Sequence, residues 1–245
     1  MRVLTGTSGW SYPAWKGRFY PEDLPSTRFL AHYARRLDTV EVNATFYRAP
    51  RPETLAAWRG EAPSWFVFAL KAPQRITHRK RLVDVGGDVA WFLRAAAELG
   101  PALGPVLFQL PPTLRQDLPR LRELLAALPR GGHFALEVRH ESWLADETFT
   151  ALADAGVALC VADTEETSTP LVATAPFGYL RLRRPDYDGA ALARWAERIQ
   201  GQRWTDAFVF FKHEDEARGP EYALRMAELA GHGAAAEPGP GAPAP

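Results

Sequence analysis

The chain has 245 residues, of which 47% are hydrophobic and 24% charged, the composition of an ordinary soluble globular protein. Its 29 basic and 29 acidic residues cancel, so no net charge attracts nucleic acid or an acidic membrane surface. No stretch approaches the ~20 apolar residues that cross a bilayer, and no secretory signal pattern opens the chain. We therefore expect a cytoplasmic protein in which Cys160, the single cysteine, is a buried apolar residue.

Short apolar runs recur from the start of the chain to residue 211. Each run is apolar at successive positions, which is typical of parallel strands that are covered on both faces. The eight predicted strands are Val3–Thr7, Thr39–Asn43, Trp65–Leu70, Pro105–Leu110, Phe134–Val138, Val157–Ala162, Gly178–Leu182 and Ala207–Phe211.

Amphipathic stretches with helical spacing separate most of these runs. Residues 163–177 are the exception, because they contain two prolines, many threonines and no apolar stripe, so we predict a loop in place of the sixth helix. The predicted helices are Ser26–Leu37, Pro52–Arg59, Asp88–Leu99, Leu118–Leu128, Asp146–Ala155, Gly189–Gln200 and Pro220–Leu229.

This alternation predicts a single TIM-like (β/α)8 barrel over residues 1–230, with an open doubly wound sheet as the alternative. Residues 231–245 are mostly glycine, alanine and proline, and we predict a disordered tail.

Polar residues stand at the end of every predicted strand. Since active sites of such barrels lie at the C-terminal strand ends, these residues predict the position of a site. Two rare residue types contribute: Asn43 is the only asparagine, and Lys71 is one of only four lysines among 29 basic residues. We expect the polar face of each strand end to point into the barrel, because the outer face must pack beneath helices.

Several stretches resemble the YecE-like family, also called domain-of-unknown-function family 72. The resemblance implies a TIM-like barrel but no defined activity. The matching stretches are GTSGWSYPAWKGRFYP (6–21), VEVNATFYRAP (40–50), FALKAPQRITHRKRL (68–82), GPVLFQLPP (104–112), HFALEVRHESW (133–143), VADT (161–164) and YLRLR (179–183).

Two carboxylates at neighbouring strand ends favour acid/base chemistry on a small anionic or polyhydroxylated substrate. We predict Glu137, Asp163 and Lys71 as catalytic residues of a non-redox hydrolase, lyase or isomerase. No glycine-rich nucleotide motif is present, so no cofactor is predicted. The predicted substrate-binding residues are Trp10, Asn43, Tyr47, His78, Gln109, Arg139, His140, Trp143 and Arg181.

Three alternatives remain open at this point. Glu41, Glu137, Asp163 and His140 are usable ligands for a divalent metal ion, although the neighbouring cations oppose one. Lys71 follows an apolar strand and could form a Schiff base. The basic residues within 75–81 and the nearby aromatic rings could instead bind nucleic acid or a phosphate without catalysis, against which the zero net charge counts.

Overall fold

The computed structural model of the chain is a closed barrel of eight parallel strands, in which each strand pairs with the next and β8 pairs with β1. The structure describes residues 1–48, 50–166, 168–212 and 215–231. The strands are β1 (Arg2–Ser8), β2 (Thr39–Val42), β3 (Val67–Lys71), β4 (Leu103–Gln109), β5 (Phe134–Glu137), β6 (Ala158–Asp163), β7 (Phe177–Leu182) and β8 (Asp206–Phe211).

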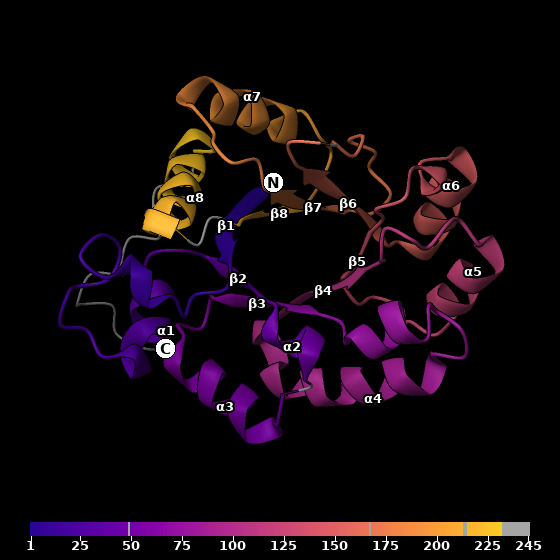
Figure 1. The fold of residues 1–245 in the computed structure, drawn as a ribbon, viewed down its shortest axis with the longest axis horizontal. Helices are drawn as coiled ribbons and strands as arrows, with labels where there is room; N and C mark the ends of the chain where they lie inside the picture. The colour runs from indigo at the N-terminus through magenta and orange to yellow at the C-terminus, as the bar shows by residue number, and fades with distance from the viewer. Residues whose placement is uncertain (49, 167, 213–214, 232–245) are drawn as a thin grey trace, which may run out of the picture.

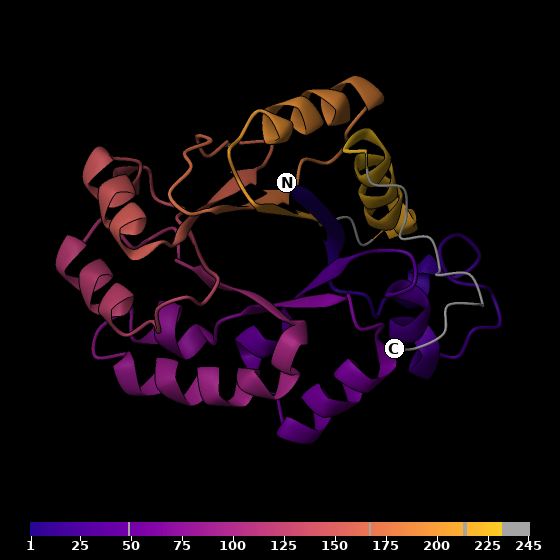
Figure 2. The same cartoon turned by 180° about the vertical axis from the view of Figure 1, so that it is seen from behind.

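Helices encircle the strands when the barrel is seen from either end (Figures 1 and 2). The α-helices are α1 (Phe29–Tyr33), α2 (Ala44–Tyr47), α3 (Pro52–Glu61), α4 (Gly86–Ala96), α5 (Leu118–Ala126), α6 (Asp146–Ala155), α7 (Gly189–Gln200) and α8 (Arg218–Leu229). Short 3-10 turns are η1 (Pro13–Trp15), η2 (Ser26–Arg28), η4 (Ala97–Ala102), η5 (Glu141–Trp143) and η6 (Asp215–Ala217), and η3 (Arg75–Arg79) is a π-helix.

The predicted (β/α)8 barrel is confirmed, and each of the eight predicted strands forms. The predicted loop between the sixth and seventh strands also forms, because the described residues between Asp163 and Phe177 contain no helix. The predicted helix at 26–37 is instead a 3-10 turn followed by the five-residue α1. The sequence pattern did not predict α2 or the π-helix η3. The tail prediction for 231–245 concerns residues that, beyond Gly231, lie outside the described ranges.

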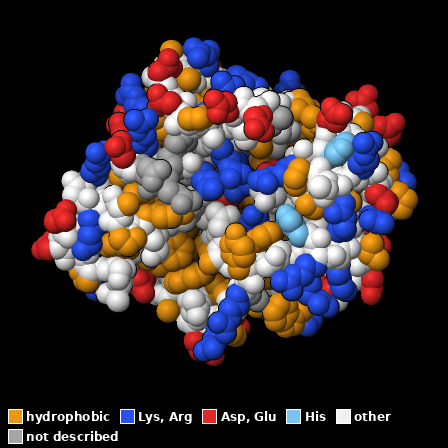
Figure 3. Space-filling model, in the orientation of Figure 1, with side chains coloured by type: hydrophobic (Ala, Val, Ile, Leu, Met, Phe, Trp, Pro, Cys, Tyr) orange, Lys and Arg blue, Asp and Glu red, His pale blue; other side chains and the backbone are white. Residues whose placement is uncertain are grey.

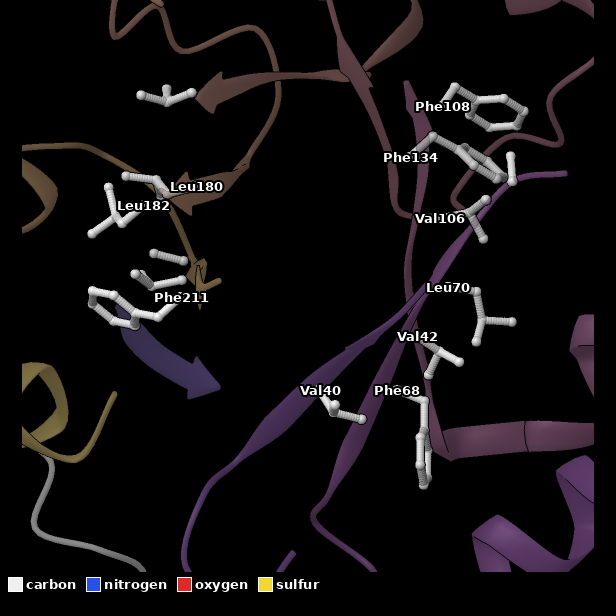
Figure 4. Close-up of a cluster of buried hydrophobic side chains, with 14 of the residues drawn as sticks. Val40, Val42, Phe68, Leu70, Val106, Phe108, Phe134, Leu180, Leu182 and Phe211 are labelled. Atoms are coloured by element: carbon white, nitrogen blue, oxygen red, sulfur yellow. The ribbon is translucent and has the colours of Figure 1, made fainter. Parts of the chain in front are cut away.

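Side chains alternate along each strand between the barrel interior and the helix layer. The outward set is large and apolar, and Figure 4 shows members such as Val40, Phe68 and Leu180 pointing away from the strands toward the surrounding shell. The inward set forms a second buried cluster that includes Leu107, Cys160 and Phe210, so Cys160 is buried as predicted. The apolar interior fills the base and middle of the barrel.

Above this apolar interior, at the C-terminal ends of the strands, the inward side chains become polar. We call this end of the barrel the mouth. The strand register sets Ser8 beside Glu41 and Gln109 beside Glu137. All four side chains are buried, and hydrogen bonds or ion pairs hold each of them. Barrel closure therefore brings together polar groups that are far apart in the sequence.

The described residues include no helix that is both long enough and apolar enough to span a membrane.

Closure between β1 and β2 depends on the absence of a side chain at Gly6. A Cβ atom at Gly6 would lie 1.9 Å from the carbonyl oxygen of Thr39, a backbone atom of the paired strand. We expect Gly6→Ala to lower the free energy of unfolding by about 1–3 kcal/mol or more, as overpacking does. Gly60→Ala is the matched control, because a Cβ there meets nothing within 4 Å and alanine favours helix α3, which predicts a gain of about 0.5–1 kcal/mol. Urea unfolding of both variants measures the difference, and equal stabilities would contradict it.

Candidate functional site

The guanidinium of Arg181 lies at the centre of the mouth, between two carboxylates. Its Nη2 donates to Glu41 Oε1 at 2.8 Å, and its Nη1 donates to Glu137 Oε2. All three side chains are buried, with Arg181 only 2% exposed. Burial alone would lower the pKa of Arg181, but the two carboxylates hold it well above its ordinary value. Arg181 therefore carries a permanent positive charge that links β2, β5 and β7.

Glu41 is held by four donors. Tyr179 donates to its Oε2 at 2.8 Å, and Ser8 and Asn43 donate to its Oε1 at 2.8 Å and 3.2 Å, beside the bond from Arg181. Burial would raise the pKa of Glu41, but Arg181 and these hydrogen bonds lower it below its ordinary value. Asn43, which we predicted to orient substrate, holds Glu41 in place through this bond.

Both oxygens of Glu137 are also engaged. Arg139 donates to Oε1 at 2.9 Å, and Gln109 donates to Oε2 at 2.8 Å, the oxygen that also faces Arg181. Burial would raise the pKa of Glu137, but Arg181 and Arg139 bring it down to about 2. At neutral pH this carboxylate is ionised, so it is poorly suited to act as a general acid.

Lys71 lies one amide group away from Glu137. Its ammonium donates to Gln109 Oε1 at 2.8 Å and stands 4.0 Å from the centre of the Phe46 ring. Among the described residues, no carboxylate oxygen comes within 4.0 Å of it, and the residue is only 8% exposed. Burial first, and repulsion by Arg181 second, lower the pKa of Lys71 to about 8. Lys71 therefore exchanges a proton closer to neutral pH than an ordinary lysine does.

His78 and Phe46 form the wall beside Lys71. Phe46 belongs to α2, whose Thr45 hydroxyl donates to the carbonyl oxygen of Lys71 at 2.6 Å and so fixes the short helix over β3. His78 belongs to the π-helix η3. Its imidazole packs edge-to-face on the Phe46 ring, with the two ring centres 4.9 Å apart. Burial and the charges of Lys71 and Arg139 lower the pKa of His78, which keeps the ring neutral at pH 7.

An open cleft of about 730 Å³ adjoins the mouth, between the end of β5 and the loop that joins β6 to β7. Its lining includes the buried Glu137, the half-buried Arg183 and the exposed Arg139, together with the exposed Glu141, Glu165 and Glu166. The guanidinium of Arg183 is half-buried and has no carboxylate within 4.0 Å among the described residues. Figure 3, which views the face on which α2 lies, shows Lys and Arg side chains gathered over the centre of the barrel.

Asp163 does not lie with Glu137, and the prediction that it would serve as the partner of that carboxylate at the mouth is wrong. Its Oδ2 accepts from Tyr187 at 3.0 Å, from Arg184 at 2.9 Å and from the indole of Trp195 at 3.3 Å, beneath helix α7. The physical reason is strand alternation. Asp163 shares the outer face of β6 with Val161, while the small residues Cys160 and Ala162 face inward.

The predicted aromatic contacts divide into three situations. Trp143 is fully buried and donates its indole N–H to the carbonyl oxygen of Leu114 at 2.8 Å, so its prediction as a substrate contact is wrong. Trp10 is half-buried and packs edge-to-face on Trp58, with ring centres 5.2 Å apart. Tyr47 is 75% exposed on α2. Of the three, Tyr47 has the side chain most available to a ligand.

His140 lines the cleft, and its Nδ1 accepts from the backbone N–H of Ser142 at 3.1 Å. The four residues considered as metal ligands do not converge, because Asp163 faces α7 while Glu41 and Glu137 direct oxygens at Arg181. Over the described part of the chain, no three His, Cys, Asp or Glu residues gather in a way that could hold a metal ion.

The profile of the family described as "Protein of unknown function DUF72" matches residues 4–244. The chain belongs to the DUF72 family. The UPF0759 protein YecE of Escherichia coli (strain K12) is 33% identical over 144 residues, which cover 58% of this chain and 50% of YecE, so the match spans about half the length of that relative. The UPF0759 protein YunF of Bacillus subtilis (strain 168) is 24% identical over 87% of this chain and 79% of its own.

A crystal structure of a DUF72 family protein from Thermotoga maritima MSB8 superposes with a TM-score of 0.81 at 25% identity. The superposition covers 95% of this chain and all of that one. These likenesses show the family and the barrel, and none of the descriptions states a substrate or a reaction.

Four residues of this DUF72 mouth were absent from the predicted site. Glu41, Ser8 and Tyr179 support Arg181, and Arg183 lines the cleft. Strand alternation was the available signal for three of them, because Glu41 shares a face with Asn43, and Tyr179 and Arg183 share one with Arg181. Ser8 had no comparable signal, since its role depends on a neighbour that only barrel closure supplies.

The ion triad of this DUF72 protein predicts a pH-dependent stability. Glu137→Gln removes one of the two carboxylates that face a buried guanidinium, so we expect the free energy of unfolding at pH 7 to fall by about 3–5 kcal/mol. Because folding lowers the pKa of Glu137 from 4.5 to about 2, its stabilisation is present above pH 4.5 and disappears as the pH falls toward 2. The difference between wild type and variant should shrink over that range.

Urea unfolding at several pH values measures this difference. Glu141→Gln is the control, because Glu141 is exposed in the lining of the cleft and its loss should change stability by no more than about 0.5 kcal/mol. A Glu137→Gln variant as stable as Glu141→Gln at pH 7 would contradict the assigned triad.

Proposed function

We propose that this protein is an enzyme that binds a small anionic or polyhydroxylated substrate at the mouth and moves a proton with Lys71. The observation that carries the proposal is a pair of partly buried cations, Lys71 and Arg183, that have no carboxylate partner among the described residues. A buried cation without a counter-ion is costly, and an anionic ligand would supply the missing charge. The reaction would be that of a hydrolase, lyase or isomerase.

The charges around the mouth support an anionic substrate group. Among the described residues, four cationic side chains, Lys71, Arg139, Arg181 and Arg183, surround two inward carboxylates. Glu41 and Glu137 are engaged by Arg181, so the excess positive charge lies on the other cations. The exposed Glu141, Glu165 and Glu166 also line the cleft, where they would repel an anion that did not reach the more buried cations.

The proton-transfer role passes from Glu137 to Lys71 in this proposal. Glu137 has a pKa of about 2 and has both oxygens bonded, whereas the pKa of Lys71 lies near 8. A group is most effective as an acid or base when its pKa is close to the working pH. Glu137 would then hold Gln109 and Arg181 in position, and Gln109 would orient the amine. The single buried cysteine is in keeping with a reducing compartment, which favours the cytoplasm.

Binding of a simple anion tests this proposal. We expect millimolar orthophosphate or a carboxylate metabolite to raise the Tm of the wild-type protein, because the ligand stabilises only the folded state. Arg183→Gln should lose most of that shift. Arg122→Gln, which removes an exposed arginine of helix α5, should keep it. A metabolite screen by thermal shift would then identify candidate substrates, and equal shifts for the two variants would contradict the site.

Binding of nucleic acid without catalysis is the second candidate, favoured by the basic residues of η3 and the segment after it. Several of those cations already have partners. Arg75 and Lys80 both pair with Asp88, at 2.6 Å and 2.8 Å, and Arg81 donates to Thr113. With zero net charge, few basic groups are left for phosphates.

Retention on heparin separates the two candidates. We expect weak retention that a low concentration of added salt already abolishes, because few contacts to the sulfate groups of heparin would form. Elution only at several hundred millimolar salt, lost on Arg79→Gln, would favour the nucleic-acid function over the enzyme.

A further inference from the structure

Lys71 differs from the other three lysines of the chain. Lys80 pairs with Asp88 at 2.8 Å, Lys212 is exposed and Lys16 is half-exposed. Lys71 alone is buried, and its contacts are a neutral amide oxygen and an aromatic ring. Its surroundings therefore favour the neutral amine, which is the nucleophilic form.

We propose that Lys71 forms a protonated imine with the carbonyl carbon of a small anionic aldehyde or ketone. This inference rests on the proposed function and names its substrate class. The carbonyl group would reach the Lys71 amine beside Gln109, and the carboxylate or phosphate of the substrate would face Arg183, which lines the adjoining cleft. Lys71 itself is not among the residues that line this cleft, but the charges of Arg181 and Arg139 act on both Lys71 and Arg183. An anionic carbonyl compound would supply what both cations lack among the described residues, one by charge and the other by a covalent bond.

The lone pair of the neutral Lys71 amine attacks the carbonyl carbon, a C–N bond forms, and the carbonyl oxygen gains a proton from water while the nitrogen loses one. Loss of the resulting hydroxyl group as water, with uptake of one proton, leaves a C=N⁺ bond to Lys71. The net change is amine plus carbonyl plus one proton to iminium plus water, and no oxidant or reductant takes part.

Neighbouring residues stabilise this arrangement. Thr45 holds the backbone of Lys71 through the bond to its carbonyl oxygen, and Phe46 covers the amine. A protonated imine keeps the positive charge of the ammonium, so the ring still faces a cation after the bond forms. Arg181 repels the protonated form of the Lys71 amine, while Glu41 and Glu137 pair with the Arg181 guanidinium. The proton affinity of Lys71 is therefore lowered, and Arg183 stays available for the substrate anion.

The test is reductive trapping with glyoxylate, the smallest anionic aldehyde, on the wild-type protein in the presence of cyanoborohydride. Peptide mass spectrometry then measures N-carboxymethylation at each lysine. We expect Lys71 to be modified at least tenfold faster than Lys16, Lys80 and Lys212, which are internal controls in the same molecule. Glycolaldehyde, a neutral aldehyde of similar size, should modify Lys71 several-fold more slowly than glyoxylate does.

The pH profile gives a signature that simple accessibility would not produce. With a pKa of about 8, the neutral fraction of Lys71 rises roughly tenfold between pH 7 and pH 9 and then levels off. An ordinary lysine, with its pKa near 10.4, gains roughly 100-fold over the same interval and continues to rise. The rate at Lys71 should therefore level off above pH 9 while the rates at the control lysines still increase.

The outcomes distinguish this inference from the proposed function. Modification of Lys71 no faster than of the control lysines would overturn the imine, even if orthophosphate still raised the Tm. Rapid modification by both aldehydes alike, unchanged in Arg183→Gln, would support the nucleophilic lysine and overturn the anion site. Circular dichroism of Arg183→Gln ensures that a slower reaction does not reflect unfolding.

Discussion

A single guanidinium organises the functional end of this barrel. Arg181 lies buried between Glu41 and Glu137, so three strands that are distant in sequence share one ion triad. An ion taken out of water must be closely paired, because the loss of hydration is otherwise not recovered. The pairing leaves both carboxylates ionised, and the side chains of Ser8, Asn43, Tyr179, Gln109 and Arg139 direct donors toward them. The positions of these five side chains follow from this constraint.

The triad divides the polar groups at the mouth into those that bond to its two carboxylates and those that do not. Ser8, Asn43, Tyr179 and Gln109 use their hydrogen-bonding capacity on the two carboxylates. Lys71 and Arg183 remain outside the triad. The charge of Arg181 acts on both, and neither has a carboxylate partner among the residues that the structure describes. Repulsion from Arg181 adds to burial in lowering the pKa of both groups. In the function that we propose, the two carboxylates hold Arg181 and Gln109 in place, while Lys71 and Arg183 meet the substrate.

Prediction from sequence succeeded for the barrel and for the convergence of three charged side chains at its mouth. Glu137, Arg139 and Arg181 were predicted together because each stands at or just after a strand end, and the structure joins all three. Asp163 failed the same argument, since it ends a strand whose inward positions are small and whose outward positions are apolar. Trp143 failed because nothing local shows that a ring after β5 turns into the core and bonds to Leu114.

Local pattern in the chain was enough to predict the alternation of strands and helices, the loop between β6 and β7, and the end of the barrel that carries polar groups. These features depend on local periodicity and on the twofold repeat of a strand, which a single chain displays. Tertiary structure alone decided which face of each strand points inward and which charges meet. Both depend on barrel closure, which places β2, β5 and β7 around one guanidinium and sets the Lys71 ammonium against the amide of Gln109.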